Sequence, residues 1–276
     1  MGGSASPGAQ EFLGFSVLAD LSEVRAARRE LEDLRLPFPS SSPFARRLQR
    51  TVALLRGRSD SWRLAPDPLK SWDTWRTLRI VQDLLRPEQA VLDMGSLASA
   101  VPVALARRGY IRVSGIDLDP RVTQMPERER IDYCVGDMTK THWPDGHFSL
   151  ITCISALEHG VDERRLLAEV RRLLAPGGVF VFSTDYWPAK IDTTGESAFG
   201  LPWKIFSREE IEQFVGQARR TGLCVTGRWR EPLDAVPAQA PISWNGRRYT
   251  FLHGSLMRAT AEGGSPPGPN SSEESP

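Results

Sequence analysis

The sequence predicts an α/β fold with a doubly wound, mainly parallel sheet, an antiparallel last strand and an N-terminal helical extension. Three observations predict it. From residue 90 onward, short apolar runs alternate with amphipathic segments, as in parallel strands covered by helices on both faces. Residues 90–120 follow the order strand, tight turn, helix, strand, acid, which is typical of a nucleotide-binding βαβ unit. Before residue 87, apolar residues recur at helical spacing.

Length and composition are compatible with one globular domain, because the chain has 276 residues, 40% of them hydrophobic. The formal net charge of +1 argues against a protein that coats nucleic acid. Ten arginines and four acids nevertheless lie between Arg25 and Arg63. We interpret this excess first as a solvated helix face, with a surface for an anionic acceptor, a phosphate or nucleic acid as the alternative. No aromatic-rich RNA-binding motif accompanies it, so we expect no nucleic-acid partner.

The cysteines and the apolar runs indicate the cellular environment. Cys134, Cys153 and Cys224 form no Cys-x-x-Cys pair, and scattered Asp, Glu and His show no metal-ligand spacing. No signal-like apolar region opens the chain, and no apolar run approaches the roughly 20 residues that span a bilayer. We therefore expect a reduced, cytoplasmic protein with no metal site and no membrane partner. The sequence carries no signal for an oligomeric state.

The N-terminal third is predicted to be helical. We expect residues 1–20 to be disordered, because the first ten are rich in Gly, Ser, Ala and Pro, and residues 21–86 to form a helical cap. Apolar residues at helical spacing predict helices over 21–34, 42–57 and 71–85. Proline at position 37 ends the first of these helices, and residues 62–68 are predicted to form a loop.

Residues 87–260 are predicted to form the main domain. Asp119 and Asp162 are expected helix N-caps, and the Pro-Gly-Gly sequence at 176–178 ends the second of those helices. A further helix is expected over residues 99–108. The predicted strands cover residues 90–94, 113–116, 131–135, 148–154, 179–183, 223–229 and 249–257.

The last third contains an interruption of this alternation. Residues 186–206 are rich in Pro, Trp and Gly and are predicted to be an insertion on the acceptor side. Ser207 and Glu210 resemble a capping box that opens the next helix. The last two predicted strands are expected to pair antiparallel at the sheet edge, and residues 261–276 are expected to be a disordered tail.

Polar residues follow the predicted strands at their carboxyl ends, where ligands bind in open α/β sheets. Asp117 can accept both hydroxyls of a ribose, and Asp137 with Met138 can contact an adenine through a carboxylate and a thioether. Gly95 lets the backbone approach a ligand. The structural alternatives are turn stabilisation by Asp93, helix capping by Asp117, which Asp119 already supplies, and an ordinary strand-end acid at Asp137.

The motifs VLDMG, GIDLD, VGDM, FSLITCIS leading into LEH, and LLAPGGVF resemble, in this order, those of class I S-adenosylmethionine-dependent methyltransferases, in particular the methyltransferase type 11-like family. The resemblance covers about residues 90–257 and implies a Rossmann-like sheet of seven strands, the last one reversed. It also implies S-adenosylmethionine as the cofactor. The residues that it places at the cofactor are Asp93, Gly95, Ser96, Asp117, Leu118, Asp137, Met138 and Ser155.

The glycine loop departs from the family pattern acid-x-Gly-x-Gly-x-Gly. Leu97 and Ser99 stand at the second and third glycines, and a side chain at Leu97 can crowd the methionine part of the cofactor. Small residues at Ser96 and Ala98 leave room for an adjusted loop. The departure argues against a pyrophosphate-binding dinucleotide site, and no Walker A pattern that would indicate an NTPase occurs.

The resemblance implies in-line methyl transfer to an oxygen or nitrogen of a small-molecule or sugar-containing acceptor. A base near the methyl group accelerates such a reaction by roughly 10²–10⁴-fold, and the candidates are His159, Asp185 and Tyr186. His253 is expected to be structural. The alternatives are a binding protein of this fold without transferase activity, because of the altered loop, a different S-adenosylmethionine-dependent reaction, or an enzyme that acts on an anionic or nucleic-acid acceptor.

Overall fold

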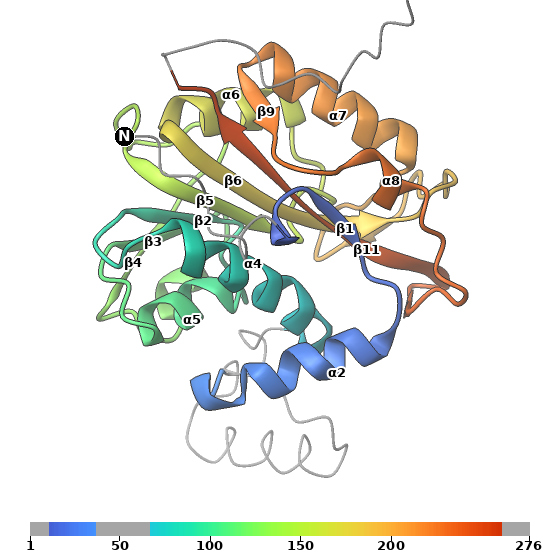
Figure 1. Ribbon diagram of the computed structural model, residues 1–276, viewed down its shortest axis with the longest axis horizontal. Helices are drawn as coiled ribbons and strands as arrows, with labels where there is room; N and C mark the ends of the chain where they lie inside the picture. Colours follow the sequence, from blue (N-terminus) through green and yellow to red (C-terminus); the bar gives the residue numbers. More distant parts are fainter. Residues whose placement is uncertain (1–10, 37–66, 261–276) are drawn as a thin grey trace, which may run out of the picture.

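The computed structural model describes residues 11–36 and 67–260, and its centre is a mixed sheet with the strand order β1-β11-β6-β5-β2-β3-β4 (Figure 1). β9 and β10 also pair with β11, whereas β7 and β8 form a separate hairpin. The expectations for residues 1–10, 37–66 and 261–276 lie outside the described residues. The strands are β1 (Phe15–Val17), β2 (Val91–Met94), β3 (Val113–Asp117), β4 (Ile131–Val135), β5 (Phe148–Ile154), β6 (Leu174–Tyr186), β7 (Ser197–Ala198), β8 (Leu201–Pro202), β9 (Leu223–Val225), β10 (Ile242–Trp244) and β11 (Arg247–Arg258).

Helices cover both faces of the sheet, which confirms the predicted fold class (Figure 1). α6 and α7 pack on one face, and α4 and α5 pack on the other. α2 lies outside α4, where the indoles of Trp72 and Trp75 donate to Glu23 and Glu30 at 2.9 and 2.6 Å. The helices are α2 (Leu21–Glu30), η1 (Glu32–Leu34), η3 (Pro68–Lys70), α4 (Ser71–Leu84), α5 (Val101–Arg107), η4 (Pro120–Gln124), α6 (Glu163–Leu173), α7 (Arg208–Arg220) and α8 (Arg230–Leu233).

The connectivity of the sheet determines where a ligand can bind. β2 to β6 are parallel, and the chain builds outward through β3 and β4 before it crosses back to β5. The order therefore reverses between β2 and β5, and the loops that leave these two strands diverge. β11 runs antiparallel to β6 and pairs antiparallel with β9, as expected, although β11 itself lies inside the sheet.

The N-terminus adds a strand that the sequence did not predict. Phe15 to Val17 pair with residues 252–254 of β11, and the ring of Phe15 packs edge-on against Phe182 at 5.6 Å. The expectation of disorder over residues 1–20 is therefore wrong for residues 11–20. The physical reason is that β11 presents backbone groups that need partners, and β1 supplies them.

Several boundaries also differ from the predicted ones. β6 begins at residue 174, directly after α6, and its pairing with β5 shifts register between Phe148 and Leu150. The helix α6 therefore ends before the Pro-Gly-Gly segment, as expected, but this segment lies within β6. Asp162 caps α6, and Ser207 with Glu210 forms a complete capping box on α7. Among the described residues, no helix is both long enough and apolar enough to cross a membrane.

Candidate functional site

The carboxyl ends of four neighbouring strands bring the predicted cofactor residues to one edge of the sheet. Asp93 lies in β2 and Asp117 ends β3, while Asp137 and Ser155 follow β4 and β5. β2 pairs with β3 on one side and with β5 on the other, and β4 pairs with β3. The parallel register therefore assembles side chains that are up to 62 residues apart in the chain.

Asp93 is buried beneath the loop that follows β2. Its Oδ1 accepts a hydrogen bond of 2.5 Å from the hydroxyl of Thr152, and its Oδ2 is buried with no partner among the described residues. Burial raises the pKa of this carboxyl to about 6, while the hydrogen bond from Thr152 favours the charged form. The hydrogen bond from Thr152 therefore joins the end of β2 to β5 beneath the loop.

The loop itself accommodates the two missing glycines. Gly95 has φ +73°, and a Cβ there would lie 2.5 Å from the Cβ of Ala156, so this glycine is required. Leu97 packs against a small cluster formed by Val122 and Met125. Ala98 takes the left-handed conformation, with φ +60°. The side chain of Leu97 thus lies in an apolar contact, and Ala98 provides the second left-handed residue of the loop.

Asp117 connects the loops after β2 and β3. Its Oδ2 accepts the backbone N–H of Leu97, and its Oδ1 accepts that of Asp119, both at 2.9 Å. Each carboxylate oxygen has a second lone pair, so these bonds leave acceptor capacity for a ligand. Asp119 caps η4, as expected, through the N–H of Arg121.

Two apolar side chains lie exposed beside this acid. Leu118 is 65% exposed and Val135 is 50% exposed, at the ends of adjacent strands β3 and β4. Asp137 is exposed and its Oδ1 accepts from the N–H and the hydroxyl of Thr139, whereas Met138 is half-buried against the core. The sequence analysis did not identify Val135. Its position two residues before the strand-end acid Asp137 is comparable to that of Leu118, which directly follows the strand-end acid Asp117.

The segment after β5 contains two unusual residues. Ser155 has φ +51°, and its hydroxyl oxygen is buried without a partner among the described residues. The ring of His159 packs edge-on against Phe199, with 5.6 Å between ring centroids. Burial lowers the pKa of His159, as does the charge of Lys70, whereas the charge of Asp185 opposes the shift. His159 is therefore mostly neutral at pH 7 and can accept a proton.

The other two base candidates lie on opposite faces of β6, because successive side chains of a strand alternate. Asp185 is buried, and its Oδ2 accepts the indole N–H of Trp203 at 2.8 Å. Tyr186 is also buried, but its hydroxyl donates to the carbonyl of Leu233 at 2.6 Å. Burial raises the pKa of that phenol. The hydroxyl of Tyr186 is therefore engaged with a backbone carbonyl on the face opposite Asp185, and its base role stays a prediction.

A buried charge cluster beside Asp185 was missed by the sequence analysis. Nζ of Lys70 lies 3.8 Å from a carboxylate oxygen of Asp73 and of Asp185, and 3.2 Å above the ring of Phe251. Burial raises the pKa of both aspartates to about 7 and also raises the pKa of Glu158. In the sequence, Lys70 and Asp73 look like the polar start of a helix, so only their tertiary position reveals the cluster.

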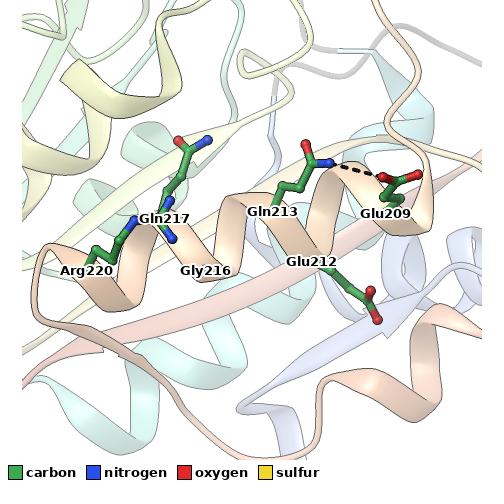
Figure 2. Close-up of a pocket in the computed structure, with 6 residues that line it drawn as sticks. All are labelled: Glu209, Glu212, Gln213, Gly216, Gln217 and Arg220. Carbon is green, nitrogen blue, oxygen red and sulfur yellow. Dashed lines mark hydrogen bonds between the residues drawn. The ribbon is translucent and has the colours of Figure 1, made fainter.

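A separate surface hollow lies on α7, and Figure 2 shows the six residues that line it. All of them come from this one helix, and the hydrogen bond drawn joins Gln213 to Glu209 at 3.2 Å. None of the predicted site residues lines this hollow. We assign no function to it.

Comparisons with known proteins identify a methyltransferase domain in part of the chain. A family model described as a methyltransferase domain matches residues 92–182, from β2 into β6. A candidate methyltransferase from Bacillus halodurans C-125 has a similar structure, with a TM-score of 0.51 and 15% identity over 68% of this chain and 99% of that chain. Residues 92–182 therefore match a methyltransferase domain, and the chain shares the fold of that structure.

Two curated relatives have similar sequences. Norajmaline N-methyltransferase from Rauvolfia serpentina is 27% identical over 172 residues, which cover 59% of this chain and 57% of that protein. Ubiquinone biosynthesis O-methyltransferase from Coxiella burnetii is 29% identical over 123 residues, which cover 42% of this chain and 52% of that protein. The chain spans about half the length of these curated relatives.

Proposed function

We propose that the protein transfers a methyl group from S-adenosylmethionine to an oxygen or nitrogen of a small-molecule or sugar-containing acceptor. The observation that carries this proposal is the convergence of Asp93, Asp117, Asp137 and Ser155 at the reversal point of a class I methyltransferase sheet. The names of the two curated relatives, an N- and an O-methyltransferase, support a small acceptor.

The residues at the strand ends fit the proposed cofactor. Asp117 would bind the ribose hydroxyls with its remaining lone pairs. Leu118 and Val135 would contact the adenine with their exposed apolar surfaces, and Asp137 and Met138 would border it. Buried polar atoms without partners among the described residues suit a polar ligand, and they belong to Asp93, Ser96 and Ser155.

The proposed mechanism assigns simple tasks to the protein. S-adenosylmethionine, when bound, supplies a methyl group that its sulfonium already activates. The strand-end loops hold donor and acceptor in line and exclude water, which supplies several kcal/mol. His159 takes the proton that the acceptor oxygen or nitrogen loses as its bond to the methyl carbon forms. Asp185, which Trp203 holds in place, stabilises the resulting positive charge on His159.

Calorimetry with S-adenosylhomocysteine tests the cofactor assignment. We expect binding to the wild-type protein, and absence of binding at millimolar ligand in folded protein would refute the proposal. Asp117→Ala should weaken binding at least about 10-fold, because charge-assisted hydrogen bonds to the ribose are lost. Asp132→Ala is the matched control, since Asp132 is an exposed acid near the start of β4.

The Asp117 variant needs a check on the loop, because Asp117 also accepts two backbone N–H groups. Asp117→Asn keeps one acceptor oxygen, so it should retain more of the loop structure than the alanine variant. Urea unfolding of both variants separates a loss of stability from a loss of binding. Equal affinity of wild-type protein and Asp117→Ala would remove the ribose role.

A further inference from the structure

The β7–β8 hairpin ends in a turn whose sequence does not suit its conformation. Phe199 and Gly200 join the two strands with φ +56° and +82°. A two-residue loop with both φ values positive is a type I′ turn, which favours Asn-Gly. The β10–β11 hairpin of the same chain follows this preference, with Asn245-Gly246 at φ +49° and +73°. A phenylalanine at the first position is strained.

The side chain of Phe199 is also placed unfavourably for stability. It is 89% exposed, the highest value among the exposed large hydrophobic residues that the structure describes. A single exposed apolar residue is ordinary. An exposed ring on a strained backbone combines two unfavourable features, and neither is explained by packing of the hairpin.

Contacts at the base of the hairpin hold this ring beside His159. The N–H of Lys204 donates to the carbonyl of Glu158 at 2.9 Å, next to His159 in the chain. Glu196 accepts from Arg247 at 2.9 Å and from Asn245 at 3.1 Å, which joins the two hairpins. The rings of Phe199 and His159 then meet edge-on at an interplanar angle of 77°.

We propose that Phe199 determines acceptor specificity, and that the acceptor carries an aromatic ring that packs on Phe199 next to the atom from which His159 takes the proton. This inference rests on the proposed function. An aromatic acceptor would cover the exposed ring and gain both apolar burial and ring–ring attraction. A saturated acceptor of the same size would gain only the burial.

Two substitutions test whether the Phe199-Gly200 turn is strained, independently of ligand binding. Phe199→Asn installs the residue that the turn prefers, so its urea midpoint should equal or exceed that of the wild-type protein. Asn245→Phe places the same strain in the other hairpin and removes the contact of Asn245 with Glu196, so we expect a lower urea midpoint. A urea midpoint of Phe199→Asn clearly below that of the wild-type protein would overturn the premise that this turn is strained for function.

The binding probe is 1-naphthol, measured by calorimetry with saturating S-adenosylhomocysteine and compared with decahydro-1-naphthol and methyl β-D-glucopyranoside. We expect wild-type protein to bind 1-naphthol at least about 5-fold more tightly than either comparison compound, and Phe199→Asn to bind it about 10-fold more weakly. Phe199→Leu should fall between the two.

The outcomes distinguish this inference from the proposed function. If S-adenosylhomocysteine does not bind, the proposed function fails and this inference fails with it. If S-adenosylhomocysteine binds but 1-naphthol binds equally to wild-type protein and Phe199→Asn, or does not bind at all, only the role of Phe199 is overturned. Preference for the glucoside over 1-naphthol would also overturn it.

Discussion

Thr152→Val removes the hydroxyl that donates a hydrogen bond to the buried carboxylate of Asp93, and it conserves side-chain shape. The lost hydrogen bond is 2.5 Å long and lies in the sheet interior. A hydrogen bond to a charged group contributes about 1.5–3 kcal/mol, whereas one to a neutral group contributes about 0.5–1.5 kcal/mol. The substitution should therefore destabilise the protein more when Asp93 is charged than when it is protonated.

The pH at which Asp93 changes charge follows from its raised pKa. The folded pKa is about 6 and the usual value is 3.8. Between these values the folded state binds more protons than the unfolded state, so the contribution of Asp93 to stability is present below about pH 4 and is lost as pH rises through 6. The loss is about 3 kcal/mol. Because the Thr152 hydroxyl lowers this pKa, Thr152→Val should enlarge the total loss of stability and extend it to higher pH.

Urea unfolding at pH 5 and pH 8 measures this effect. We expect Thr152→Val to cost about 1 kcal/mol at pH 5 and about 2–3 kcal/mol at pH 8. Thr152→Ser is the matched control, since it keeps the hydroxyl and removes only the methyl group, so its cost should not depend on pH. An equal cost of Thr152→Val at both pH values would refute the assignment of Thr152 as the donor that favours charged Asp93.

Three further predictions concern other residues of the site. Ala98→Gly should raise the free energy of unfolding by about 0.5 kcal/mol, since the relief of a left-handed alanine exceeds the added chain entropy; a lower urea midpoint would contradict this. Asp73→Asn should reduce the loss of unfolding free energy between pH 4 and pH 8 by up to about 4 kcal/mol, because the substitution removes a carboxyl whose folded pKa is about 7. Exposed Asp83→Asn on the same helix is its control, and equal pH profiles of the two variants would exclude a buried charged Asp73. The His159 imidazole should titrate below pH 6.5 by NMR, with His159→Gln for assignment, and a midpoint at or above 6.5 would argue against its burial.

Much of the fold could be predicted from local patterns. The β2–β3 unit, α4, the Asp162 cap and the capping box of α7 depend on apolar periodicity and on hydrogen bonds between near neighbours in the chain. β1 could not be predicted, because three residues carry little periodicity and their pairing partner lies more than 230 residues away in β11.

The candidate site could likewise be predicted only in part from the sequence. Its acids could be predicted from strand ends, and the motifs lie within or beside residues 92–182, which match a methyltransferase domain. The predicted strand ended at residue 183, so Asp185 and Tyr186 both looked suitable. β6 continues to Tyr186, and the two side chains therefore point to opposite faces. The place of Leu97 likewise depends on Val122 and Met125, which lie in a different segment.

The sequence by itself determined the alternation of strands and helices, the acids at the strand ends and the match of residues 92–182 to a methyltransferase domain, because these depend on residues close together in the chain. Only the tertiary structure decided that Lys70 meets Asp73 and Asp185 in one buried cluster, and that Phe199 lies against His159. Such contacts join separate segments, and the pKa shifts of the cluster arise from burial, which only the packed fold creates.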